Sequence, residues 1–81
     1  MALYTKHEFG LELRSQIDDD FNPERISKWA WERVIAELSR LDHGVLNTMM
    51  QVVTMGDGAM PAMSEHELIL FAERLIKPIS N

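Results

Sequence analysis

The sequence predicts an all-α protein, a compact bundle of four short helices within a single domain of residues 1–81. Apolar residues recur every three to four positions in four segments, which is the period of amphipathic helices. Helix-capping residues precede these segments, and glycine or proline interrupts the chain between or after them. The hydrophobic share of 46% is typical of a folded domain of modest stability at this length. The expected helices span residues 6–18, 23–41, 44–55 and 65–77.

The first helix has a clear start. Thr5 and Glu8 have the spacing of a capping box, and Tyr4 and Phe9 have that of a hydrophobic staple. Gly10 is expected to weaken the helix by about 1 kcal/mol relative to alanine. Leu11 falls off the apolar stripe, so the helix should bury a single edge, formed by Phe9, Leu13 and Ile17.

The central helix carries the longest helical pattern in the chain. Asn22 is a favoured N-cap, Pro23 suits the first helical position, and the aspartates at 18–20 read as the connection from the first helix. Its apolar residues cover about half of the circumference, a wider arc than contact with one helix requires, so this face can contact two neighbours. They are Ile26, Ala30, Trp31, Val34, Ile35, Leu38 and Leu41.

Two further helices follow. Asp42 is a cap for a third helix, whose apolar spacing favours helix although its β-branched residues also permit a strand. Glycines at 56 and 58 end that helix. Ser64 and Glu67 repeat the capping-box spacing for a fourth helix, which Pro78 ends.

Composition limits the setting in which the protein works. There is no cysteine, so disulfides and thiolate chemistry are excluded, and no apolar run approaches the roughly 20 residues that cross a bilayer. With no segment resembling a signal peptide, we expect a cytoplasmic protein without membrane contact. The net charge is −5, and only residues 25–40 are basic. Such a surface suits a soluble protein or a basic partner and opposes non-specific binding to nucleic acid.

No pattern for catalysis, metal or cofactor binding emerges. His7, His43 and His66 lack chelating spacing with the acidic residues, and the aspartate run lacks the glycine and glutamate of a calcium loop. Ser64 is explained as a helix cap, and no P-loop lysine follows the glycines near residue 57. We therefore expect neither an enzyme nor a cofactor.

A partner-binding strip is the main functional candidate. Trp29 lies opposite the apolar arc, on a strip with Arg25, Arg33 and Arg40, and tryptophan and arginine are enriched in binding hot spots. The alternative is that the first helix or the acidic connection folds over this strip. Met60 and Met63 are further candidates, because flexible methionines suit adaptable surfaces, whereas Met49 and Met50 are expected in the core.

The leading hypothesis is a small non-enzymatic intracellular protein that binds another protein as an adaptor, inhibitor or regulator. The wide apolar arc of the central helix, together with off-face apolar residues at Leu11, Trp29 and Leu70, favours self-association, with a homodimer as the expected form.

The rival hypothesis is a DNA-associated regulator in which the second and third helices form a helix-turn-helix. Asn47, Thr48 and Gln51 are its candidate base-reading residues. Residues 45–55 contain no arginine or lysine for phosphate contacts, so nucleic acid ranks below a protein partner.

Overall fold

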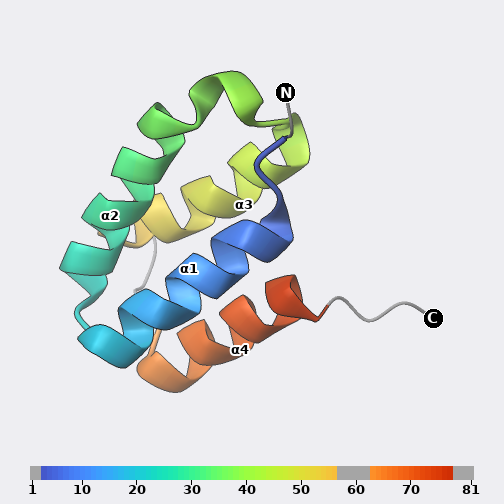
Figure 1. Cartoon of the computed structure of the whole chain (residues 1–81). Helices are drawn as coiled ribbons and strands as arrows, with labels where there is room; N and C mark the ends of the chain where they lie inside the picture. The colour runs from blue at the N-terminus through green and yellow to red at the C-terminus, as the bar shows by residue number, and fades with distance from the viewer. Residues whose placement is uncertain (1–2, 57–62, 78–81) are drawn as a thin grey trace.

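Four α-helices follow one another in the computed structural model, which describes residues 3–56 and 63–77 (Figure 1). They are α1 (Lys6–Asp19), α2 (Pro23–Ala36), α3 (His43–Val53) and α4 (Glu65–Ile76). Single 3-10 turns, η1 (Leu38–Arg40) and η2 (Thr54–Gly56), extend α2 and α3. The prediction of a small all-α bundle is confirmed. Within the described ranges no helix is long and apolar enough to cross a membrane.

Side-chain caps begin the helices, as the sequence predicted. Thr5 accepts a hydrogen bond from the Glu8 amide at 3.1 Å, and Ser64 and Glu67 form a complete capping box. Asn22 and Asp42 cap α2 and α3 in the same way. Each of these bonds satisfies a backbone N–H group that has no partner inside its helix. The predicted helix end at Pro78 lies outside the described residues.

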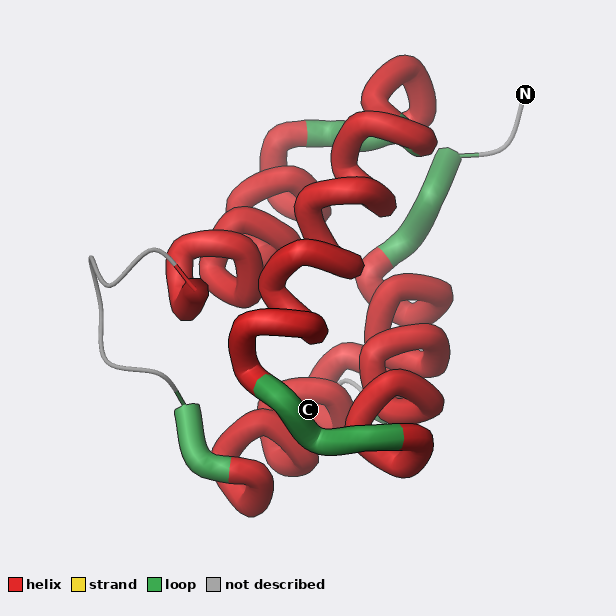
Figure 2. Tube along the Cα trace, turned by 90° about the vertical axis from the view of Figure 1, so that its left-hand side faces the viewer, coloured by secondary structure: helices red, strands yellow, loops and turns green. Residues whose placement is uncertain are grey.

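The helices pack mainly as two pairs, α1 with α4 and α2 with α3. The partners in each pair run in opposite directions (Figure 1), and Figure 2 shows the same bundle after a quarter turn. Gly10 explains how closely α1 and α4 approach, because a Cβ at this position would lie only 2.7 Å from Leu75 Cβ. The sequence had suggested only that this glycine weakens its helix.

The core lies between the two pairs, and all four helices contribute to it. Phe9 and Met49 are fully buried, whereas Met50 is partly buried and packs against the core. Tyr4, which precedes α1, is 1% exposed and completes the predicted staple with Phe9. The other buried apolar residues are Leu13, Ile17, Ile26, Ala30, Val34, Val45, Val52, Val53, Met55, Leu68 and Ala72.

Only part of the wide apolar arc of α2 is buried within the bundle. Ile26, Ala30 and Val34 are buried, as expected. The three other large members are open to solvent: Trp31 is 46% exposed, Ile35 57% and Leu38 60%. The helix also ends at Ala36 rather than continuing to residue 41. The covered side of α2 thus includes Trp29, which faces α1, and only part of the apolar arc.

Candidate functional site: two faces of the central helix

Arg25 begins the predicted binding strip, and the structure places it against the end of α1. Its Nη1 donates to Gln16 Oε1 at 2.6 Å and its Nη2 to the Gln16 carbonyl at 2.8 Å. A further bond reaches the Asp20 carbonyl, and Nε lies 3.7 Å from the Asp20 carboxylate. This guanidinium therefore fastens the α1–α2 connection to α2.

Trp29 faces α1 in the middle of the strip. Its ring stacks on that of Phe9, with centroids 5.5 Å apart and an angle of 8° between the planes. Trp29 is partly buried and packs against the core. The indole is thus a contact between helices of the same chain, which is the folded-back arrangement considered from the sequence.

Arg33 lies at the centre of a polar cluster between α1, α2 and the segment before α1. Its Nε lies 3.2 Å from Glu12 Oε1, its Nη2 donates to Glu37 at 2.9 Å, and its guanidinium sits 5.5 Å from the centre of the Tyr4 ring. The Tyr4 hydroxyl donates to Glu12 Oε1 at 2.5 Å. Burial, together with this bond to a carboxylate, raises the pKa of Tyr4 well above its ordinary value.

Arg40 shares the Glu37 carboxylate with Arg33, whereas Met63 lies away from this cluster on the core. Arg40 Nη1 donates to Glu37 at 2.8 Å, and the Arg40 carbonyl accepts from the Tyr4 amide at 3.0 Å. Met63 is partly buried and packs against the core. Met60 lies outside the described residues. The structure thus brings Arg25, Trp29 and Arg33 together, but on a face that α1 occupies.

The open face of α2 carries the three exposed members of its apolar arc, Trp31, Ile35 and Leu38, hereafter the α2 stripe. Spacings of four and three residues align them along one side of the helix and its 3-10 extension. Among the described residues, the remaining exposed large apolar side chains lie outside α2, at Leu3, Leu11 and Leu70. The width of the apolar arc was the only signal of this surface in the sequence.

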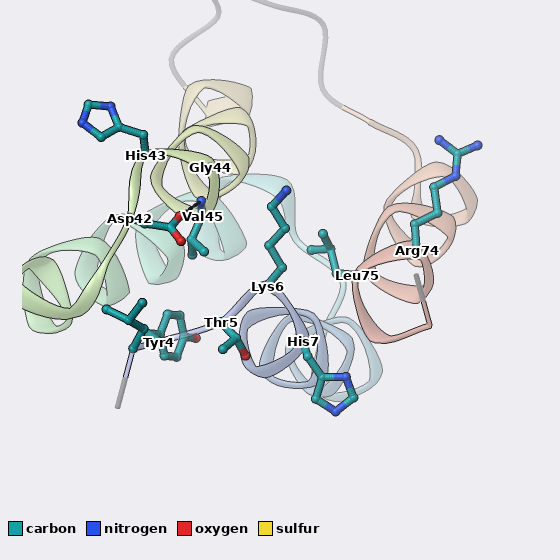
Figure 3. Close-up of a pocket in the computed structure, with 11 residues that line it drawn as sticks. Tyr4, Thr5, Lys6, His7, Asp42, His43, Gly44, Val45, Arg74 and Leu75 are labelled. Atoms are coloured by element: carbon teal, nitrogen blue, oxygen red, sulfur yellow. Dashed lines mark hydrogen bonds between the residues drawn. The ribbon is translucent and has the colours of Figure 1, made fainter. Parts of the chain in front are cut away.

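A cleft of about 930 Å³ opens where the beginnings of α1 and α3 meet the end of α4 (Figure 3). Lys6 extends across it, whereas His7 and His43 point away from it (Figure 3). The His7 Nδ1–H donates to the Ile76 carbonyl at 2.9 Å. Of the two hydroxyl residues that line the cleft, Thr5 caps α1 and also lies 3.5 Å from the Glu8 carboxylate, and Tyr4 donates to Glu12.

Metal binding and DNA reading by α3 have little support in the described part of the chain. No group of three histidine, aspartate or glutamate side chains gathers there as metal ligands. In α3, the Thr48 side chain is buried and its hydroxyl donates to the Gly44 carbonyl at 2.9 Å. Of the three candidate base-reading residues, only Asn47 and Gln51 are exposed.

Comparison with known proteins adds no assignment, since no family model, curated protein or solved structure matches this chain. The choice among these surfaces therefore rests on their geometry and exposure.

Proposed function

We propose that this protein acts by binding another protein through the α2 stripe, as an adaptor, inhibitor or regulator. The observation that carries the proposal is the alignment of a tryptophan, an isoleucine and a leucine that are each about half exposed. Fully burying such a side chain is worth about 1.5–3 kcal/mol, so covering the open half of all three contributes roughly 2–5 kcal/mol. Monomers seldom leave such a patch without a partner.

Binding rather than catalysis is supported by how the described hydroxyl side chains are used. Ser64 and Thr5 cap helices. Ser27 donates to the Val53 carbonyl, and Thr48 donates within α3. Each of these four hydroxyls thus bonds to the backbone of its own chain. We further propose a cytoplasmic setting, which the cysteine-free sequence favours.

The test compares two single substitutions that add the same charge. Ile35→Asp places a carboxylate in the α2 stripe, and Leu11→Asp places one at a comparably exposed position, 48% open, on α1. Each purified full-length protein is immobilised, and the proteins retained from a lysate of the source cell are quantified by mass spectrometry. We expect the wild type and Leu11→Asp to retain a shared set that Ile35→Asp loses. Identical profiles for all three proteins would contradict the proposal, provided that circular dichroism shows both variants folded.

A further inference from the structure

We infer that the cleft at the beginnings of α1 and α3 and the end of α4 binds a small organic acid. This acid has an apolar body and a single negative charge, as a medium-chain fatty acid does. The cleft volume of about 930 Å³ falls within the range of small-ligand sites, about 300–1,000 Å³. None of the described residues that line the cleft belongs to α2, so this site is separate from the α2 stripe and goes beyond the proposed function.

The cleft has apolar walls that come from three segments of the chain. Leu3 and Tyr4 precede α1, Val45 lies in the first turn of α3, and Leu75 lies in the last turn of α4. Tyr4 and Val45 are buried, whereas Leu75 is partly buried and Leu3 is 53% exposed. An apolar chain in the cleft covers the open parts of Leu3 and Leu75, and removing this surface from water favours binding.

Two cationic side chains line the same cleft. Lys6 extends between α3 and α4, and Arg74 lies on the α4 side of Leu75 (Figure 3). Neither forms an ion pair with another described residue, whereas each arginine of α1 and α2 does. Lys28 and Lys77 also have no acidic partner among the described residues, but they lie outside the cleft. The cleft thus joins apolar walls to two cations that an anion can reach.

The balance of charge in the cleft favours a ligand with one negative charge. Asp42 is the one acidic side chain among the described lining residues, and it caps α3 by accepting a hydrogen bond from the Val45 amide. Lys6 and Arg74 together therefore exceed Asp42 by one positive charge when the histidines are neutral. A single carboxylate balances this charge. The second negative charge of a phosphate monoester would have no cation left to balance it and would be repelled by Asp42.

The contact between Lys6 and Gly44 places the carboxylate of the ligand. A Cβ added at Gly44 would lie 3.8 Å from Lys6 Nζ, so the ammonium group lies beside the first turn of α3. The positive end of the α3 dipole adds to the attraction of Lys6 for an anion there. A large side chain at position 44 would fill the space next to the ammonium group.

Titration of the isotopically labelled full chain with octanoate, followed by NMR, tests the inference. We expect saturable shifts of the amides of Gly44, Val45 and Leu75, with a dissociation constant on the order of 1 mM for a ligand of this size. Octylammonium, which has the same chain length and the opposite charge, should bind there at least about fivefold more weakly. Equal binding of the two amphiphiles, or no saturable shift of these amides with octanoate, would overturn the inference.

Matched variants test the assigned residues. Lys6→Gln should weaken octanoate binding about threefold, because it removes an exposed charge from the cleft. Lys28→Gln removes the same charge from an exposed position on α2 and should leave binding nearly unchanged. Gly44→Leu should abolish the shifts while keeping α3, because leucine has a higher helix propensity than glycine. Equal weakening in the two glutamine variants, or octanoate binding that survives in a folded Gly44→Leu protein, would contradict the assignment.

Discussion

Replacing the two tryptophans of α2 one at a time by alanine separates the covered face of this helix from the open one. Trp29→Ala removes the stack on Phe9 and opens a space between α1 and α2. Fully buried aromatic residues cost about 3–5 kcal/mol when replaced by alanine. Because Trp29 is only partly buried, we expect a loss of about 2–4 kcal/mol in the free energy of unfolding, including about 1 kcal/mol from the stack.

Trp31→Ala, in contrast, should change the free energy of unfolding little and should weaken association. The indole is 46% exposed, and substitutions on an open helix surface usually change stability by about 0.5 kcal/mol or less. The higher helix propensity of alanine offsets part of the lost packing. We therefore expect a stability change below about 1 kcal/mol. Association with the partner should weaken at least tenfold, which corresponds to about 1.4 kcal/mol.

Urea unfolding at low micromolar protein concentration measures both variants as monomers. A fall in the midpoint at an unchanged slope reports lost stability. At about 4–8 °C per kcal/mol for a domain of this size, Trp29→Ala should also lower the melting temperature by about 10–25 °C. The reasoning is refuted if Trp29→Ala leaves stability intact while weakening association. The strip of Arg25, Trp29, Arg33 and Arg40 would then be the interface, as hypothesised from the sequence.

Three further predictions follow from contacts inside the bundle. Gly10→Ala should destabilise the protein by about 1–2 kcal/mol in urea unfolding despite the better helix propensity of alanine, because the added methyl meets Leu75. Ser27→Ala should cost about 1–2 kcal/mol in the same assay, because it leaves a buried carbonyl of α3 without its donor. The raised pKa of Tyr4 predicts stability that is intact below pH 10.0 and falls above it, where the unfolded chain loses the phenolic proton first. Tyr4→Phe, which removes the only tyrosine, should abolish that component of alkaline unfolding.

The helices and their starts were predictable from the sequence because the signals are local. An N-cap side chain bonds to an amide two or three residues away, so Thr5, Asn22, Asp42 and Ser64 mark helix starts wherever the helices pack. The orientation of α2 was not predictable in this way. The width of an apolar arc indicates how much of the helix surface favours burial. It does not indicate which part of that surface the neighbouring helices cover.

The other features that the sequence did not predict depend on contacts between segments that are far apart in the chain. The close approach at Gly10 depends on Leu75 in α4, and periodicity carries no information about that pairing. The bond from the Tyr4 amide to the Arg40 carbonyl likewise joins the segment before α1 to the turn after α2. This bond lies at the 3-10 turn of residues 38–40, which takes the place of the last part of the expected long helix.

The charge layout of the chain gives a physical reason for the orientation of α2. The segment before α2 is acidic and α2 itself is basic, so the two attract each other, and they meet where Arg25 and Arg33 face Asp20 and Glu12. This contact turns the strip around Trp29 toward α1. The neighbouring arc at Ile26, Ala30 and Val34 then packs in the core. The rest of the apolar arc, the α2 stripe, is not covered by another described helix. Arg25 and Arg33 thus bond α2 to α1 and its connection, and the α2 stripe is left exposed on the other side of the helix.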